Sequence, residues 1–334
     1  MLPVSGFRRP AQGQAVRFCP CPALMTTPRT PGRLANLLLL LALWGVWGYN
    51  WVVTKEGLNY AGPFALAVGR SVLAVATLGL VLLLSGRSLR PPPWRPTLLI
   101  ALTQTAGFTA LTNLALLFGG AGKVSVLCYT MPFWTLLFAW VFLGERVRGW
   151  QWLGVGLALA GLVLILEPWN LTSGSISNWL ALAGGICWAA SAILIKRMRR
   201  QGPVDPLGLT FWQMVWGTLP LTALWWMIPG PPVVWGWPLL LVLLFAGCLA
   251  GGLGWLVWTL LLSRLSAGTA SLNILAIPGV AVLAAWLQLG EVPDMFESMG
   301  MLLIALALAV LAFLTIKGER RLKGLAQARP EKCK

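Results

Sequence analysis

Residues 132–145 read PFWTLLFAWVFLGE, and residues 278–291 read PGVAVLAAWLQLGE. Both segments begin with proline and end in Leu-Gly-Glu at the same spacing, and an offset of 146 residues separates them. Gly154 and Gly300 match at the same offset. Because self-similarity at a fixed period is the sequence signature of repeated units, these segments predict a chain built from two related halves.

Weaker matches extend the repeat toward the start of each half. A single Leu-Gly-Glu sequence carries little information, but several matches in the same order favour a duplication. At offsets of 141 to 143 residues, the paired positions are Trp47 with Trp188, Asn50 with Ser191, Lys55 with Lys196, Pro63 with Pro206, and Arg70 with Gln213. The predicted organisation is a disordered cytoplasmic tail at residues 1–32, a first half at 33–167, a second half at 175–316 and a basic cytoplasmic tail at 317–334.

The composition places the chain in a membrane. Of its 334 residues, 58% are hydrophobic and only 10% are charged, and the mean hydropathy is +0.78. A soluble domain carries about 25% charged residues, so this chain lacks the polar surface that a water-exposed fold requires. The net charge of +16 would suggest nucleic-acid binding in a soluble protein, but the basic residues lie in short clusters between apolar runs. Such clusters orient a membrane protein and contact lipid headgroups, so the expected partner is the lipid bilayer and no nucleic acid.

Ten apolar runs are long enough to cross the bilayer, since about 20 mostly apolar residues span its hydrocarbon core. Short joins with charged or turn-forming residues separate the runs. We therefore expect an all-α integral membrane fold with ten transmembrane helices at residues 34–54, 63–84, 97–118, 122–143, 149–167, 177–196, 206–228, 237–262, 268–289 and 296–316.

The basic residues orient these spans through the positive-inside rule. With the N-terminus in the cytoplasm, 22 Lys and Arg residues fall on the cytoplasmic side, Lys55 and Lys123 fall outside, and Arg70 lies within a span. Both termini are thus predicted to be cytoplasmic, and the expected location is a bacterial inner membrane. Five spans is an odd number, so the second half enters the membrane in the opposite orientation. Inverted repeats are a transporter design, because the same packing can open to either side.

These ordered residues resemble those of the drug/metabolite transporter superfamily, specifically its EamA-like branch of ten-helix proteins. The resemblance covers residues 34–316 and rests on Trp47-Gly48, Lys55, the Pro63…Arg70 pair, the Pro132…Glu145 segment and their second-half counterparts. It implies two five-helix bundles around a central cavity, alternating access, and export of amino acids, metabolites or toxic compounds. The second half departs from the first at Ala189 and Gln213, so the roles of Gly48 and Arg70 are not simply duplicated.

Arg70 is the charged residue that lies well inside a predicted span, seven residues into the second. A charge in the membrane interior is costly, so an intramembrane arginine is by default a functional candidate. Arg70 could bind a substrate carboxylate, which would suit an amino acid or an organic anion. The alternative is a structural anchor that reaches toward the headgroups or caps helix-end carbonyls.

Other candidate substrate contacts are polar or aromatic side chains within the spans. Several threonines of the third span share one helical face, which favours either a cavity wall or hydrogen bonding between helices. The 20 tryptophans divide between span ends, where they anchor the interface, and deeper positions, where they line an aromatic cavity or pack against lipid. The predicted substrate-binding residues are Asn50, Arg70, Gln104, Thr109, Asn113, Tyr129, Trp188, Ser191, Gln213, Trp255 and Asn273.

Pro132 and Pro278 are predicted to lie in the middle of equivalent helices. Each proline would leave the carbonyl four residues earlier without its helical partner, and would bend the helix. Equivalent bends in both halves favour a gating role, although purely structural bends would give the same pattern.

The chain contains no histidine, and its nine carboxylates lie at helix ends, in loops or in tails. This distribution predicts no catalytic residues, no metal site and no cofactor. Proton relays in pumps use acidic or histidine side chains inside the membrane, so we expect a facilitator or exchanger rather than a proton antiporter. The first alternative is a lipid or lipid-linked sugar translocase of the same fold; a membrane-embedded enzyme and a non-transporting scaffold are weaker alternatives. The sequence carries no signal for an oligomeric state.

Overall fold

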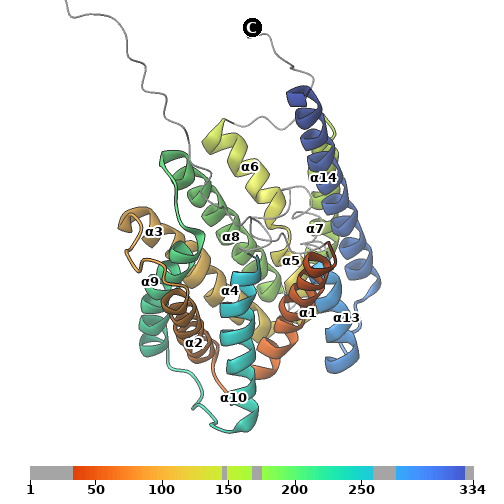
Figure 1. Ribbon diagram of the computed structural model, residues 1–334. Helices are drawn as coiled ribbons and strands as arrows, with labels where there is room; N and C mark the ends of the chain where they lie inside the picture. Colours follow the sequence, from red (N-terminus) through yellow and green to blue (C-terminus); the bar gives the residue numbers. More distant parts are fainter. Residues whose placement is uncertain (1–32, 145–148, 168–174, 259–275, 328–334) are drawn as a thin grey trace, which may run out of the picture.

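The computed structural model of the protein describes residues 33–144, 149–167, 175–258 and 276–327. Within these residues the chain forms helices and no β-strand (Figure 1). The helices of the first half are α1 (Arg33–Gly57), α2 (Pro63–Leu84), α3 (Trp94–Ile100), the π-helix η1 (Ala101–Gly107), α4 (Phe108–Phe118), α5 (Ala121–Cys128), α6 (Met131–Leu143) and α7 (Gln151–Leu166). Those of the second half are α8 (Ser175–Gln201), α9 (Pro206–Met227), α10 (Trp237–Leu243), the π-helix η2 (Leu244–Leu253), α13 (Ala276–Leu289) and α14 (Met295–Gln327).

Five of the described helical segments have the length and composition of membrane spans, which confirms the predicted all-α membrane fold, while the number of ten spans stays a prediction. The third span combines α3, η1 and α4, and the eighth combines α10, η2 and the residues up to Trp258. The beginning of the ninth predicted span, 268–289, lies outside the described residues. The five segments that are long and apolar enough to cross a membrane are Pro63–Leu84, Trp94–Phe118, Ala121–Leu143, Ile176–Gln201 and Trp237–Trp258, and the shorter apolar helices are Gln151–Leu166, Ala276–Leu289 and Met295–Leu311.

The fourth predicted span, 122–143, is not a continuous helix. α5 ends at Cys128 and α6 begins at Met131, so the predicted mid-helix position of Pro132 is wrong, and Pro132 lies in the first turn of α6. Proline has no N–H to donate to the carbonyl of Cys128, and its ring clashes with that carbonyl, so the chain breaks into two helices instead of bending one. A first turn tolerates proline because no intrahelical donor is needed there. Pro278 is the third residue of α13 as described.

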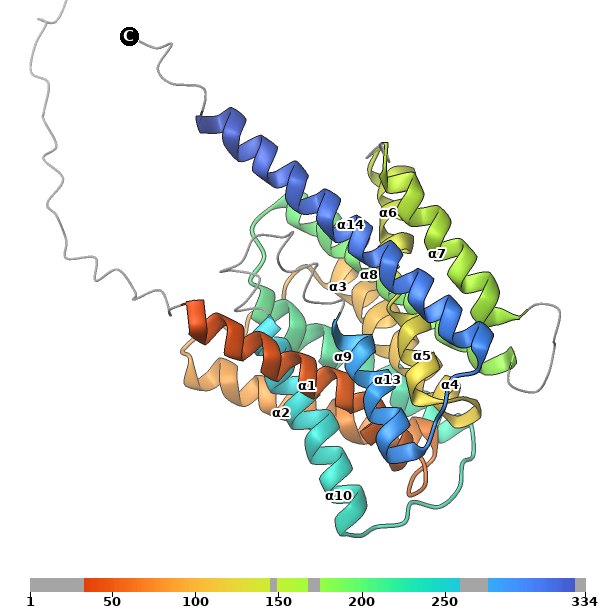
Figure 2. The ribbon, with the colours of Figure 1, turned by 90° about the vertical axis from the view of Figure 1, so that its right-hand side faces the viewer.

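The C-terminal helix continues past the predicted span. The sequence predicts a span ending at residue 316 and a basic tail after it, and α14 runs on through the first part of that tail to Gln327. Residues 317–327 are mostly Lys, Arg, Leu and Glu, which are strong helix formers, so the helix has no reason to stop at the end of the apolar run. The extension carries basic residues away from the bundle (Figure 2).

Helices of the two halves pack in pairs that the repeat relates to each other. α1 packs along α13, and its counterpart α8 packs along α6. In the same way α2 packs on η2, while α9 packs on η1. The fifth helix of each half, α7 or α14, packs against its own counterpart, and the two lie side by side at one edge of the molecule (Figure 2). The halves are therefore interlocked, and a cavity between them takes residues from both.

Two π-helices occupy corresponding positions, η1 in the third span and η2 in the eighth. π-helical turns are uncommon and frequently lie at functional sites. Glycine accommodates the wider turn, since a Cβ on Gly107 would lie 2.9 Å from the carbonyl oxygen of Leu102, five residues earlier. Both π-helices contribute residues to the cavity between the halves.

Candidate substrate-binding cavity

The cavity between the two halves has two adjoining compartments. The inner compartment has a volume of about 100 Å³, and the outer compartment has a volume of about 420 Å³. Both compartments are lined by Trp47, Gln104, Trp188 and Trp255. These four side chains come from α1, η1, α8 and the segment after η2, so both halves form the boundary between the compartments.

The outer compartment lies at the end of the molecule that carries Arg199. Its wall consists mainly of residues from α8 and α9, among them Ser191, Arg199 and Gln213. Its volume falls within the range of roughly 300–1,000 Å³ that is typical of small-molecule sites. The outer compartment is therefore large enough for the body of a small metabolite.

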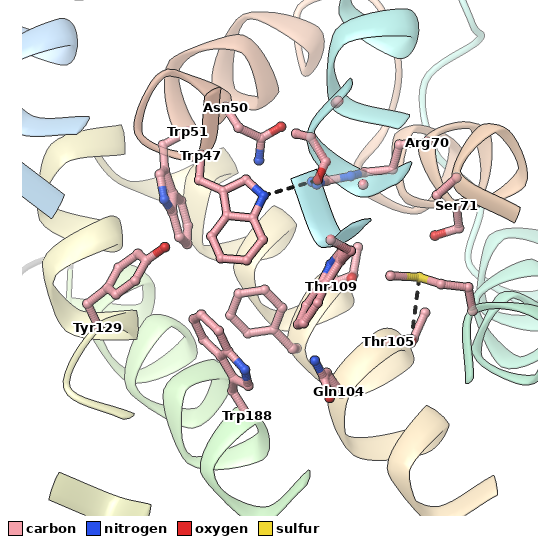
Figure 3. A pocket seen from close by; sticks show the side chains of 17 residues that line it. Trp47, Asn50, Trp51, Arg70, Ser71, Gln104, Thr105, Thr109, Tyr129 and Trp188 are labelled. Carbon is pink, nitrogen blue, oxygen red and sulfur yellow. Dashed lines mark hydrogen bonds between the residues drawn. The ribbon is translucent and has the colours of Figure 1, made fainter. Parts of the chain in front are cut away.

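Four aromatic side chains form a closed ring of contacts beside the inner compartment (Figure 3). The ring centroids are 6.5 Å apart for Trp51 and Phe108, and 5.2 Å apart for Phe108 and Trp188. Tyr129 closes the ring, at 5.6 Å from Trp188 and 6.4 Å from Trp51. Aromatic pairs in tilted or edge-to-face geometry contribute about 0.5–1.5 kcal/mol beyond the area that they bury. The four rings come from α1, α4, α8 and the break between α5 and α6. Their contacts therefore pack these four segments together at one wall of the inner compartment.

Trp47 borders both compartments. Its indole Nε1 donates a hydrogen bond to the Ala250 carbonyl oxygen at 3.1 Å. Its ring centroid lies 5.4 Å from that of Trp255 and 6.0 Å from that of Trp258. A Cβ at Gly254 would lie 2.5 Å from Trp47 Nε1, so glycine at this position lets the indole reach η2.

Arg70 is the charged residue among those that line the inner compartment. Its Nη1 donates a long hydrogen bond of 3.4 Å to Thr54 Oγ1, and neither ion pair in the described part of the chain includes it. The Thr54 hydroxyl donates in turn to the backbone carbonyl oxygen of Asn50 at 2.6 Å. Asn50 Oδ1 is buried and has no hydrogen-bond partner among the described residues. Figure 3 shows the Asn50 amide and the Arg70 guanidinium on the same side of the cavity.

The turn between α4 and α5 is held by two charged side chains, one from α1 and one from the residues just after α13. Lys55 Nζ donates to the carbonyl oxygens of Leu116 and Gly119, at 2.6 and 2.8 Å. The Glu291 carboxylate accepts from the first two backbone N–H groups of α5, at 2.9 and 3.1 Å. A cation therefore caps the C-terminus of α4 and an anion caps the N-terminus of α5, as the helix dipole favours at each end.

Two further contacts hold the same region. Ser177 Oγ, at the start of α8, donates to the Ala115 carbonyl oxygen at 2.8 Å. Lys123 of α5 forms an ion pair of 2.5 Å with Glu297 of α14. Since Ser177 and Arg199 lie at opposite ends of α8, this region faces away from the outer compartment. The contacts of Lys55, Glu291, Ser177 and Lys123 join helices of both halves at the end of the molecule opposite Arg199, which we call the closed end.

Most of the predicted substrate-binding residues line the cavity. Ser191 Oγ, in the outer compartment, donates to Gln104 Oε1 at 3.1 Å and so connects two of them across the halves. Asn113 does not line either compartment: it is fully buried, and its Nδ2 donates to the Pro63 carbonyl oxygen at 2.9 Å. Asn273 lies outside the described residues. The inner compartment contains Asn50, Arg70, Gln104, Thr109, Tyr129, Trp188 and Trp255, and the outer one contains Gln104, Trp188, Ser191, Gln213 and Trp255.

Three aromatic residues that line the inner compartment, Trp47, Trp51 and Phe108, are absent from the predicted substrate contacts, as is Trp258 of the outer compartment. Trp47 is the repeat counterpart of Trp188, and Trp51 follows it by four residues on the same face of α1. The repeat and this spacing are signals from which both could be found. Phe108 carries no such signal, because the π-helix before it changes the direction of its side chain relative to a regular α-helix.

The chemistry of the lining residues suits non-covalent binding. In the inner compartment they offer one cationic group, amides, hydroxyls and aromatic faces, which is the usual combination of an apolar pocket with a few orienting polar groups. In the described part of the chain, no three His, Cys, Asp or Glu side chains gather as a metal site. The arrangement can hold a small amphipathic molecule between the two halves.

Several known proteins are similar to this chain in sequence or in fold. The profile of the EamA-like transporter family matches residues 34–167 and 175–313. A probable terminal-alkyne amino-acid exporter of Streptantibioticus cattleyicolor is 26% identical over 76% of this chain and 85% of the exporter's own length. A probable amino-acid metabolite efflux pump of Salmonella typhimurium is 28% identical over 85% of this chain and 95% of the pump's own length. A crystal structure with 20% sequence identity has the same fold, with a TM-score of 0.61 over 87% of this chain and 99% of its own. The chain is a membrane transporter and belongs to the EamA-like transporter family.

Proposed function

We propose that this transporter exports amino acids or other small amphipathic metabolites by alternating access, as a facilitator or exchanger. The observation that carries the proposal is the cavity between the halves, with the outer compartment on one side and the closed end on the other. A carrier built from inverted repeats needs such a central site, which faces one side of the membrane at a time. The relatives named as exporters of amino acids or their metabolites support the substrate class.

The distribution of charge supports an orientation for this carrier. The outer compartment contains Arg199, within the basic 196–200 segment that the positive-inside rule assigns to the cytoplasm. The closed end contains Lys55 and Lys123, the two basic residues assigned to the outside. In this proposal the conformation described above is the cytoplasm-facing state, and both termini lie in the cytoplasm of a bacterial inner membrane.

The lining residues also support flux without proton coupling. No Asp or Glu is among the described residues that line either compartment, and the chain has no histidine. Proton-coupled carriers usually place such a group inside the membrane. A site without a titrating carboxylate offers no group that could couple a proton to transport. The substrate would then move down its own gradient or exchange with another substrate molecule.

Transport by the purified full-length chain in liposomes tests the proposal. Uptake and counterflow of radiolabelled amino acids are measured with and without a pH gradient. We expect saturable flux, accelerated by substrate on the opposite side and indifferent to the gradient. Strict dependence on the gradient would contradict facilitation. If no small solute moves while labelled lipid crosses between leaflets, the lipid translocase replaces the metabolite carrier.

A blocked variant and a matched control keep this test specific. Ala250 is 3% exposed and lines the inner compartment, so Ala250→Phe should fill it and abolish flux. Ala305 on α14 is exposed, so Ala305→Phe adds the same side chain outside the cavity and should leave flux unchanged. Flux that survives Ala250→Phe would mean that substrate takes another route.

A further inference from the structure

Among the described residues Arg70 has no acidic partner, although a guanidinium inside a membrane protein ordinarily pairs with one. It lies seven residues into α2, about 10 Å from the start of the helix at 1.5 Å per residue. Its hydrogen bond among the described residues is the 3.4 Å contact with Thr54 Oγ1, and no described lining residue of either compartment is acidic. An uncompensated charge in a low-dielectric site is strongly unfavourable, so an anionic group beside Arg70 is favoured. Arg70 lines the cavity, with its guanidinium near Asn50 (Figure 3), which is not the arrangement of an arginine reaching for the headgroups.

Asn50 supplies a hydrogen-bond acceptor next to this cation. Its Oδ1 is buried and has no donor among the described residues, and a buried acceptor without a donor is unfavourable. Thr54 lies between the two residues, since its hydroxyl donates to the backbone carbonyl oxygen of Asn50 and accepts from Arg70, while Asn50 Oδ1 stays free for a ligand. A ligand that places an N–H or O–H beside its anionic group would satisfy both.

The dimensions of the cavity divide a ligand into a head and a body. The inner compartment, at about 100 Å³, is smaller than the roughly 300–1,000 Å³ of complete small-molecule sites, so it fits a head group of a few atoms. Trp47, Trp188 and Trp255 line both compartments and offer aromatic faces where the body of the ligand would pass. The outer compartment, at about 420 Å³, leaves room for the remainder.

We propose that the inner compartment is a carboxylate subsite. Arg70 pairs with the substrate carboxylate, Asn50 Oδ1 accepts a hydrogen bond from a donor on the adjacent atom, and the tryptophan faces hold an apolar body. This inference rests on the proposed transport function and narrows its substrate class to amphipathic carboxylates. Amines without a carboxylate are rejected, because the guanidinium repels an ammonium group and none of the described lining residues is acidic.

Equilibrium binding to the full-length chain in lipid nanodiscs, measured by calorimetry, tests the subsite independently of flux. The probes share one aromatic ring: phenylalanine has a carboxylate and an ammonium group, 3-phenylpropionate lacks the ammonium group, and phenethylamine lacks the carboxylate. We expect affinity to fall in that order, with phenethylamine weaker than phenylalanine by about 100-fold. Arg70→Gln should weaken both acids about tenfold or more, and Arg70→Lys should restore part of the loss. Asn50→Ala should weaken phenylalanine about tenfold and leave 3-phenylpropionate unchanged.

The outcomes separate the subsite from the transport function. Phenethylamine binding as tightly as phenylalanine, equal weakening of all three probes by Arg70→Gln, or no binding of either acid overturns the subsite. The order of the affinities of the three probes for the unmodified protein tests the carboxylate subsite even if Arg70→Gln does not fold. If the acids bind in the expected order but nothing moves in liposomes, the subsite holds and the transport proposal fails. If amines are carried in preference to acids, transport holds and the subsite fails.

Discussion

Trp188 contacts Phe108 and Tyr129 and lines both compartments, while its repeat counterpart Trp47 contacts Trp255 across the same boundary. Both indoles come from the first helix of their half. The duplication has therefore placed one tryptophan from each half where the inner and outer compartments meet. Residues at this boundary should determine how tightly an amphipathic substrate is held.

Trp188→Ala should weaken substrate binding about tenfold, because the indole face that lines both compartments, and that would contact the substrate, is lost. Titration of a bound substrate against purified protein measures this change. Trp226→Ala on α9 is the matched control, since Trp226 is 87% exposed, and its Kd should match that of the unmodified protein. Equal losses in both variants would mean that Trp188 acts through general stability.

Glu291→Gln should loosen the closed end while leaving the cavity intact. The amide keeps the shape of the side chain, but its nitrogen cannot accept a backbone N–H and the charge at the N-terminus of α5 is lost. Losing a charge-assisted bond of about 1.5–3 kcal/mol should accelerate amide hydrogen exchange at residues 121–122 by about 10–100-fold. Glu56→Gln, which alters a glutamate bonded to Asn59, is the control. Unchanged exchange in Glu291→Gln would exclude a closing role for this carboxylate.

At the level of single residues, the sequence identifies side chains that are unfavourable in lipid. It does not show whether such a side chain lines the cavity or forms hydrogen bonds between packed helices. Arg70 and Asn50 line the cavity, whereas the equally polar Asn113 bonds to a backbone carbonyl between packed helices. The sequence also cannot separate Trp51, at 7% exposed, from Trp226, at 87%. Lipid is as apolar as a protein interior, so hydropathy does not distinguish a helix face that meets lipid from one that meets protein.

The length and hydropathy of an apolar run predict a helix more reliably than they predict a break or a π-helical turn within it. The predicted span 63–84 agrees with α2 to the residue. Pro132 signals a disturbance in the fourth span, but a clean break also depends on Gly185 of α8, where a Cβ would lie 2.9 Å from the Cys128 carbonyl oxygen. This glycine is far away in sequence, so a local pattern cannot show whether the chain bends or breaks.

The crossing of α7 and α14 depends on two glycines. A Cβ on Gly300 would lie 2.7 Å from the Gly161 carbonyl oxygen and 2.6 Å from Ile165 Cγ1, so Gly300→Ala must push the helices apart. We expect a loss of about 1–3 kcal/mol, seen as a fall in the unfolding temperature of about 2–4 °C per kcal/mol.

Gly156→Ala on α7 is the matched control for Gly300→Ala, since a Cβ there meets nothing within 4 Å. Because alanine has the higher helix propensity, this control should leave the unfolding temperature unchanged or slightly raised. Thermal unfolding followed by circular dichroism compares the two. If Gly300→Ala behaves like Gly156→Ala, close packing at the crossing does not stabilise the bundle.

For the whole molecule, the repeat relates the two ends of the cavity. Lys55 and Glu291 hold the closed end, and their repeat counterparts, Lys196 and Glu145, fall on the cytoplasmic side by the positive-inside rule. If the halves exchange roles during transport, we expect those counterparts to close the cytoplasmic end in the same manner. The Leu-Gly-Glu segments that reveal the duplication would then supply one closing carboxylate to each side of the membrane.

A disulfide across the closed end tests this exchange of roles. A Cβ on Gly122 of α5 would lie 3.2 Å from the Cα of Val282 on α13, so Gly122→Cys and Val282→Cys together bring two thiols within reach of each other. In a chain whose native cysteines are replaced, oxidation of this pair should abolish flux, retain substrate binding through the outer compartment, and be reversed by reductant. Binding is expected to survive because the crosslink fixes the state in which the cavity already faces the outer compartment.

The two single variants, treated with the same oxidant, are the controls for the crosslink and should transport normally. Mass spectrometry of the oxidised double variant measures the fraction that is crosslinked. Flux in proportion to the uncrosslinked fraction is the result that alternating access requires, because substrate can leave on the far side only if α5 separates from α13. Full flux in fully crosslinked protein would mean that the substrate leaves by another path, and the closed end would then be a fixed structural seal rather than a gate.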